Sequence, residues 1–476
     1  MSNKNIFWLI ALFTAIRLIV APSFGLGVDE AHYVLYGYYL DLSYVDHPPL
    51  VGWVQAGMLY LFHDSILTAR IPAIALMAIL SWQCYRFMLI INATIKQALW
   101  ATAALNSSFM FGAIGLMLLP ENFLLVMIYP IIMSVLRIEE DGKWREYLWL
   151  GLLLGLAGLA KYTAVLLVLP LLLYIVVKKR YDLLINPRIL LTAAVGFIMI
   201  LPVLLWNASH DWISFTYQSA HVTGNSSIDL KSFMRSTIAQ FAAYNPLLFA
   251  IGFYGLVASF RSKSSPLLLA AWVGLGLEFF FIGTSFLKPV LPHWPALFYC
   301  LFIPIGTVLL MQSSPKRASI VRGVIVFSLL LSAIIHAELY AKFGRFSDYK
   351  SPFRDIYGFD IQTKQGSQLL AQIPSSKKAL AVMNWSYGSR LNYYSKPYGI
   401  KTFVLDDYNH QFALWENESP IGYDLIILHS HFNDENELTH LRCDSQAVLK
   451  KTDILLNGGK VDSVEFLQCT NYQGKK

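Results

Sequence analysis

The chain has 476 residues, of which 56% are hydrophobic and 14% are charged, and its formal net charge is +7. This composition excludes an ordinary soluble domain, because apolar segments long enough to cross a bilayer recur along most of the chain. The positive charge does not require a nucleic-acid partner, since the basic residues cluster in short loops between apolar segments, which is the cytoplasmic signature of an inner-membrane protein. The sequence therefore predicts a polytopic α-helical membrane protein.

The first apolar segment, residues 5–23, follows Lys4 and lacks an evident small-residue cleavage site. We therefore expect it to stay in the protein as the first span. Arg17 interrupts its apolar run and is expected to face the bundle interior or to extend toward the interface.

The next stretch, residues 27–53, concentrates acidic, histidine and tyrosine side chains in a chain that has few of them at membrane depth. Ionisable groups at that depth are functional candidates. The pairs Asp29-Glu30 and Asp46-His47 are separated by an aromatic, helix-compatible run, and Pro48-Pro49 fixes the backbone after the second pair. Two interpretations stand at this point: two acidic groups that face one pocket, or a solvated loop.

Basic residues on both sides of two long apolar runs predict that each run crosses the membrane twice. Residues 98–136 lie between Lys96 and Arg137, and the turn is expected at 119–122 on the outer side. Residues 147–177 also have basic residues at both ends, so a helical hairpin with Lys161-Tyr162 at its outer turn is expected. A single span is the alternative, and it would invert all downstream segments. With single spans elsewhere, the total is about eleven, which leaves the C-terminus outside.

From about residue 345 the composition becomes that of a mixed soluble segment, and residues 379–383 and 423–428 are typical of buried strands. We therefore predict a transmembrane domain over 1–344, with a first outer loop at 24–64, and an extracytoplasmic α/β domain over 345–476. Cys443 and Cys469 could pair if this domain faces an oxidising compartment, but the sequence does not give their separation.

This topology places the non-basic ionisable side chains that are near the membrane, with two lysines, at the outer ends of spans. The set comprises Asp29, Glu30, Asp46, His47, Glu121, Lys161, His210, Asp211, His221, Lys288 and His293. Carboxylates with one or two histidines can bind Mg²⁺, Mn²⁺ or Zn²⁺. No His-x-x-x-His or Cys-x-x-Cys spacing supports a metal, and a lone loop histidine is more often merely solvated.

The motifs DEAHY at 29–33 and YVDHPPL at 44–50 resemble the first outer loop of the polyprenyl-phosphate-sugar-dependent glycosyltransferases. These GT-C fold enzymes include lipid A aminoarabinose transferases and protein O-mannosyltransferases. Further similarities follow in order along most of the chain, at 120–121, 158–162, 206–221, 288–295 and 384–394.

The resemblance implies a role for each matching residue. Asp29 is the essential carboxylate, with Glu30 and Glu121 as further acidic residues of the catalytic site, and Asp46 with His221 would bind a divalent metal ion. The family often has a lysine at the position of His47, where it meets the donor phosphate. A histidine there makes the contact pH-dependent. The remaining donor-phosphate candidates are Lys161, Tyr33 and Tyr162.

The function that we expect is transfer of a sugar from a polyprenyl phosphate, such as undecaprenyl phosphate, to an envelope acceptor such as lipid A or lipopolysaccharide. The reaction would take place on the periplasmic face of a bacterial inner membrane, with Asp29 as general base if the acceptor is a hydroxyl. One alternative is a protein O-glycosyltransferase with the same donor. The other is a transporter or flippase for a lipid-linked sugar, which should show midplane charges and repeated halves. The sequence identifies neither the sugar, the acceptor nor the metal, and it does not give the oligomeric state.

Overall fold

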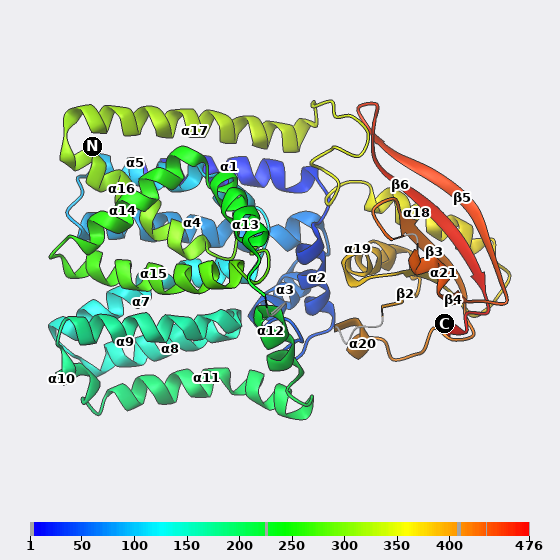
Figure 1. Ribbon diagram of the computed structural model, residues 1–476, viewed down its shortest axis with the longest axis horizontal. Coiled ribbons are helices and arrows are strands. Elements are labelled where there is room, and N and C mark those ends of the chain that lie inside the picture. The colour runs from blue at the N-terminus through cyan, green and yellow to red at the C-terminus, as the bar shows by residue number, and fades with distance from the viewer. Residues whose placement is uncertain (1–3, 224–226, 407–410, 435, 476) are drawn as a thin grey trace. The chain divides into compact units, whose positions relative to one another are not determined.

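The computed structural model describes residues 4–223, 227–406, 411–434 and 436–475, and the side chains of residues 221–223 are not described (Figure 1). The chain forms two compact units. The first comprises Met1–Ile19, Asp41–Val54 and Arg70–His336, and the second comprises Val20–Leu40, Gln55–Ala69 and Ala337–Lys476. The boundary expected at residue 345 stays a prediction.

The first unit is helical, and seven helices in the described part of the chain are long and apolar enough to cross a bilayer. They are α1 (Lys4–Val20, continued by a 3-10 turn to Ser23), α4 (Ile66–Ile90), α7 (Pro120–Glu140), α11 (Ile189–Ser209), α15 (Ser265–Ser285), α16 (Ala296–Ser313) and α17 (Pro315–Ala341). The expected polytopic helical architecture is confirmed.

The other expected crossings fall on shorter or bent helices. These are α5 (Ile95–Ser107), α8 (Trp144–Ala160), the apolar stretch Tyr162–Val177, which contains the 3-10 helix η2 (Tyr162–Leu167) and α9 (Val168–Val177), and the pair α13 (Leu230–Ala243) and α14 (Pro246–Phe260). The axes of α13 and α14 differ by 102°, so the pair is one broken span or a re-entrant segment. The total of eleven spans therefore stays a prediction.

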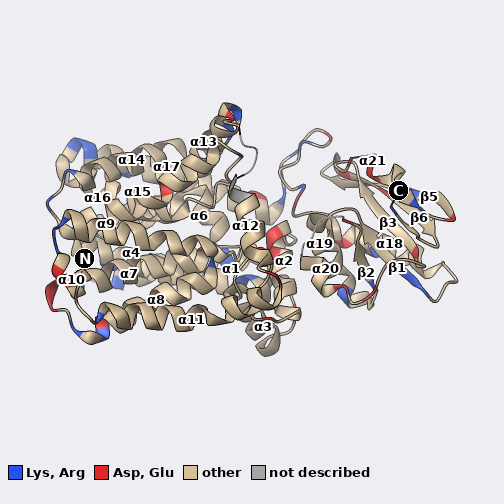
Figure 2. Ribbon diagram, turned by 60° about the horizontal axis from the view of Figure 1, so that its bottom comes forward, with Lys and Arg blue, Asp and Glu red and all other residues tan. Residues whose placement is uncertain are grey.

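The short helices α6 (Phe109–Ile114), α10 (Tyr181–Leu184) and α12 (Ile213–Thr223) connect the longer ones, and α3 (Leu50–Leu61) crosses the boundary between the units. Lysine and arginine residues, blue in Figure 2, gather in the loops at the end of the helical unit that carries α10. A one-sided distribution of this kind is the pattern that orients membrane proteins.

Close packing of α8 against α11 depends on small residues (Figure 1). A Cβ atom at Gly151 would lie 2.7 Å from the carbonyl oxygen of Thr192, so only glycine permits this approach. The Thr192 hydroxyl donates to the carbonyl oxygen of Tyr147 at 2.8 Å, which satisfies a polar group between the two helices.

The C-terminal part of the second unit is an α/β fold around a five-stranded sheet of order β2-β1-β3-β6-β5. The strands are β1 (Lys378–Val382), β2 (Thr402–Val404), β3 (Asp424–Ser430), β5 (Ser445–Leu456) and β6 (Gly459–Thr470), and β4 (Leu441–Arg442) pairs with β7 (Gly474–Lys475). β1 is parallel to β2 and β3, whereas β6 is antiparallel to β3 and β5. The two strands expected from the sequence are β1 and β3.

Alternating apolar residues of β1 cover both faces of this sheet, as the two-residue period of a strand requires. Leu380 and Val382 pack into one core, and Ala379 and Ala381 into another. The helices of this unit are α2 (Val28–Tyr38), α18 (Phe359–Ala371), α19 (Trp385–Ser395), α20 (Gln411–Trp415) and α21 (Asn436–Thr439), with the 3-10 turn η3 (Lys396–Tyr398). Cys443 and Cys469, whose pairing the sequence left open, form a disulfide bond.

Candidate functional site

The loop before α3 holds Asp46 and His47 together in the helical unit. His47 Nδ1 lies 3.1 Å from Asp46 Oδ2, and each side chain is 19% exposed. The loop is fixed by α12, because Gln218 donates to the carbonyl oxygen of Asp46 at 2.7 Å and Ser214 donates to that of Tyr44 at 2.9 Å. The second acidic-histidine pair is therefore an ordered, partly buried element and not a freely solvated loop.

A metal ion would find two of its donors in this loop. The described residues contain no group of three or more His, Cys, Asp or Glu side chains arranged for an ion. The side chain of His221, the second ligand that we expected, lies outside the described residues, although α12 carries that residue one turn beyond Gln218. Carboxylate and imidazole donors suit Mn²⁺ or Zn²⁺, so the donor chemistry fits and the metal stays a prediction.

Glu121 and Lys161 form a buried ion pair in the same unit. Glu121 lies in the first turn of α7, directly after Pro120, and Lys161 lies where α8 ends in an extended residue before η2. Lys161 Nζ pairs with Glu121 Oε1, and the two side chains are 10% and 5% exposed. The Trp294 ring lies 5.6 Å from the ammonium group. The break at Lys161 coincides with the turn of the expected hairpin.

A third group shares this carboxylate. His293 Nε2 lies 3.6 Å from Glu121 Oε1, and His293 belongs to the loop between α15 and α16. The sequence placed His293 among the outer-end residues but gave it no role, because only the fold brings residues 121, 161 and 293 together.

Tyr162 joins the Lys161 break to the first loop. Its hydroxyl lies 3.2 Å from Ser43 Oγ and donates to the carbonyl oxygen of Tyr44 at 3.4 Å. His47 also lies within electrostatic range of Glu121. The helical unit thus brings together five of the predicted site residues, namely Asp46, His47, Glu121, Lys161 and Tyr162.

Burial changes the acid–base behaviour of two side chains in the loops of this unit. Desolvation lowers the pKa of Lys288, in the same loop as His293, to about 8. Desolvation also raises the pKa of the Tyr44 hydroxyl. Tyr44 therefore stays a neutral hydroxyl at physiological pH, whereas Lys288 can change its charge just above neutrality.

The remaining predicted residues, Asp29, Glu30 and Tyr33, lie on α2 in the second unit. Glu30 is fully buried, and its carboxylate accepts the backbone N–H of Gly27 at 3.2 Å, which closes the start of the helix. Tyr33 is buried in a T-shaped contact with Tyr36. Asp29 is half-buried, and within the described part of the chain its carboxylate makes no hydrogen bond or ion pair. The catalytic role of Asp29 therefore stays a prediction.

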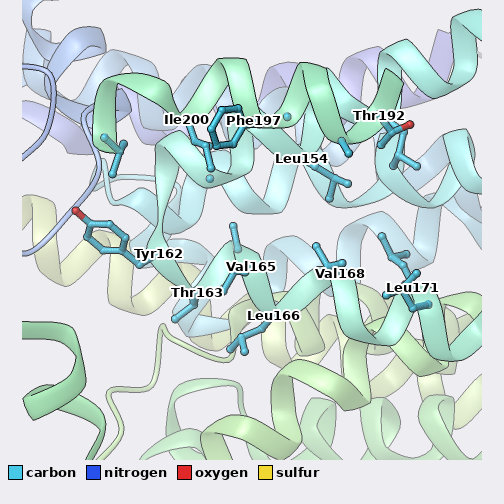
Figure 3. A pocket seen from close by; sticks show the side chains of 18 of the residues that line it. Leu154, Tyr162, Thr163, Val165, Leu166, Val168, Leu171, Thr192, Phe197 and Ile200 are labelled. Atoms are coloured by element: carbon cyan, nitrogen blue, oxygen red, sulfur yellow. The ribbon is translucent and has the colours of Figure 1, made fainter. Parts of the chain in front are cut away.

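An apolar cavity of about 830 Å³ lies in the helical unit beside the Lys161 break. Its walls come from α8, η2, α9, α11 and α12, and the lining is dominated by leucine, valine, isoleucine and glycine. In Figure 3, Tyr162 lies at one end of the labelled side chains, and Thr192 and Leu171 lie toward the other end. Gln218, which donates to the Asp46 backbone, also lines it. The cavity therefore begins at the polar cluster and continues along apolar helices.

Comparison with known proteins agrees with this architecture. The family model of the dolichyl-phosphate-mannose-protein mannosyltransferases matches residues 46–206, which include the Asp46 loop, Glu121 and Lys161. The lipid A galacturonosyltransferase RgtD of Rhizobium johnstonii is 28% identical over 253 residues. That match covers 50% of each protein, so the chain spans about half the length of this curated relative.

Two solved structures of ArnT from Cupriavidus metallidurans share the fold. Each covers 98% of both chains with a TM-score of 0.66, at 15% identity for the form bound to undecaprenyl phosphate and 13% for the apo form. A polytopic helical unit followed by a strand-containing segment, matched over nearly its whole length, defines the GT-C class of membrane protein. The chain therefore has the GT-C fold, and over residues 46–206 it is similar to the dolichyl-phosphate-mannose-protein mannosyltransferases.

Proposed function

We propose that the protein transfers a sugar from a polyprenyl phosphate carrier to an envelope glycolipid such as lipid A, on the periplasmic face of a bacterial inner membrane. The apolar cavity carries this proposal. Its volume of about 830 Å³ falls within the range of roughly 300–1,000 Å³ that is typical of small-ligand sites. A prenyl chain has no polar group to satisfy, so a leucine- and valine-lined cavity beside a cluster of ionisable groups suits a lipid phosphate.

The phosphate would lie at the Tyr162 end of the cavity, where Lys161 supplies a permanent positive charge and His47 a titratable one. Fixed cations at this position would stabilise the negative charge that develops on the leaving phosphate. In the reaction the bond between the anomeric carbon and the phosphate oxygen breaks, and its electron pair stays on the phosphate. The acceptor oxygen forms the new bond to the anomeric carbon.

The acceptor decides whether a base is needed. A hydroxyl acceptor must lose its proton, and we assign Asp29 as the group that takes it. A phosphate acceptor is already ionised, and Asp29 would then position the reactants. If a divalent ion binds Asp46 and His221, it would add positive charge near the donor phosphate; the protein groups named above bind and orient the substrates.

The periplasmic orientation is supported by two observations. Lysine and arginine residues gather in the loops at the α10 end of the helical unit (Figure 2), and basic loops are retained on the cytoplasmic side. The Cys443–Cys469 disulfide suits an oxidising compartment. Both observations support the proposal that the C-terminal domain lies outside the cytoplasm.

The decisive experiment compares lipid A, other glycans and envelope proteins by mass spectrometry in cells with the intact chain, without it, and with Lys161→Met. We expect one sugar-sized mass difference on a glycolipid that disappears in both altered strains. The same mass difference on proteins alone would replace the glycolipid acceptor with a protein acceptor. Unchanged envelope spectra, together with no transfer from a polyprenyl phosphate sugar by the purified protein, would refute the proposal.

A further inference from the structure

The Glu121 carboxylate has two potential cationic partners at a single oxygen. Lys161 pairs with Oε1, and His293 Nε2 lies 3.6 Å from the same atom. The carboxylate is 5% exposed, so it has little contact with bulk solvent. In the structure Lys161 and Glu121 neutralise each other.

This arrangement creates an electrostatic problem for donor binding. Lys161 cannot serve a phosphate fully while it neutralises Glu121, and a buried carboxylate that loses its paired cation is strongly destabilised. Lys161 can turn to a ligand only if another positive charge reaches Glu121 at the same time. His293 is already in position to supply it.

We infer that His293 is a positioning residue that takes up a proton when the donor phosphate binds, pairs with Glu121, and releases Lys161 to the phosphate. The inference rests on the proposed function, because it takes Lys161 as the phosphate contact. The charges balance: the phosphodiester brings one negative charge, and the proton that His293 takes from solution brings one positive charge. No covalent bond changes in this step.

The charged groups around His293 come from several elements. Glu121 faces it from α7 and Lys161 from the end of α8, while His47 acts on Glu121 from the first loop and Lys288 lies on His293's own loop. A histidine is the side chain that ordinarily changes charge near neutral pH. Variants at His47 and Lys288 therefore serve as comparisons, since each could also take up a proton.

The test measures proton uptake on binding of a polyprenyl methyl phosphodiester, a probe that cannot transfer a sugar and has no titration of its own near neutrality. Calorimetry of the full chain in buffers of different ionisation enthalpy should give an uptake of about one proton per ligand near pH 7.5. Above neutrality the dissociation constant should rise about tenfold per pH unit. His293→Gln should abolish the uptake and weaken binding near pH 6 by roughly tenfold or more.

His210→Gln is the matched control, because it is the same substitution at another histidine of the helical unit. His210 lies at the end of α11, where its ring centroid is 4.0 Å from that of Trp206. It should keep both the uptake and the affinity. Glu121→Gln removes the charge that needs a partner, so it should abolish the uptake and make binding independent of pH. The double variant with His293→Gln should recover the affinity that the single His293 variant loses.

The outcomes separate this inference from the proposed function. Unchanged proton uptake in His293→Gln, or uptake lost only in the His47 or Lys288 variants, would overturn the inference. If His293→Gln fails to fold, uptake retained in Glu121→Gln would overturn it and uptake lost there would support it. Phosphodiester binding that Lys161→Met leaves unchanged would instead refute the phosphate role of Lys161, and with it the proposed donor site.

Discussion

A leucine in place of Gly196 should block the cavity without disturbing the helices around it. Gly196 lies on α11 and lines the cavity, and a Cβ atom there would come no closer than 3.6 Å to the carbonyl oxygen of Gly151. That is an ordinary van der Waals contact. Leucine also has a higher helix propensity than glycine, by about 0.8 kcal/mol. The substitution should therefore fold.

The leucine side chain would occupy space for about four carbon atoms of a prenyl chain. At about 0.8 kcal/mol per buried methylene group, the lost burial is about 3 kcal/mol, which corresponds to an affinity loss of about 100-fold. We expect this loss for undecaprenyl phosphate but little change for geranyl phosphate, whose short chain should need only the Tyr162 end. The dissociation constants are measured by calorimetry in one detergent, and folding by thermal unfolding.

Gly323→Leu on α17 is the control, because within the described residues a Cβ atom at Gly323 would meet no heavy atom within 4 Å. It should bind both ligands as the unsubstituted protein does. A folded Gly196→Leu protein that binds undecaprenyl phosphate normally would refute the assignment of the cavity to the prenyl chain. Equal losses for the long and the short ligand would show damage to the phosphate end and not a blocked chain.

Three further predictions concern Asp29, Asp46 and the disulfide. Asp29→Asn should reduce turnover with a hydroxyl acceptor by roughly 10²–10⁴-fold, and near-normal rates with every acceptor would return Asp29 to a solvated position. Asp46→Asn should weaken metal binding, measured by metal analysis of the purified protein, more than it lowers the melting temperature; full transfer activity after exhaustive chelation would contradict a metal requirement. Replacing Cys443 and Cys469 by serine should lower the free energy of unfolding of the second unit by about 3 kcal/mol, and an unchanged denaturant midpoint would show that the disulfide does not stabilise it.

The sequence predicted much of the fold because membrane helices follow from local composition. Hydropathy located the spans, and the basic residues at both ends of 147–177 required a reversal, which the structure places at Lys161. The buried strands β1 and β3 were likewise visible as short apolar runs. The 102° bend between α13 and α14 was not, because a bend leaves the hydropathy of the segment unchanged.

The candidate site was only partly predictable because its residues come from distant segments. Adjacent acids at 29 and 30 suggested two similar roles, yet the Glu30 carboxylate closes the start of α2 while Asp29 is left without a hydrogen bond in the described part of the chain. The contact between His293 and Glu121 spans more than half of the helical unit's sequence, so no local pattern marks it. In the sequence, leucines and valines that line a cavity cannot be distinguished from those that pack between helices.

Val165 and Phe197 both line the cavity, yet they are 69% and 55% exposed, so the cavity opens sideways between η2 and α11. A ligand that enters there arrives by diffusion within the bilayer and never has to leave it. The occupancy of the site then depends on the mole fraction of the lipid carrier in the membrane, and not on the carrier concentration in the whole sample volume. Adding detergent at constant amounts of protein and carrier should lower the mole fraction of carrier in the micelles and slow the reaction, although the bulk concentrations of protein and carrier stay the same.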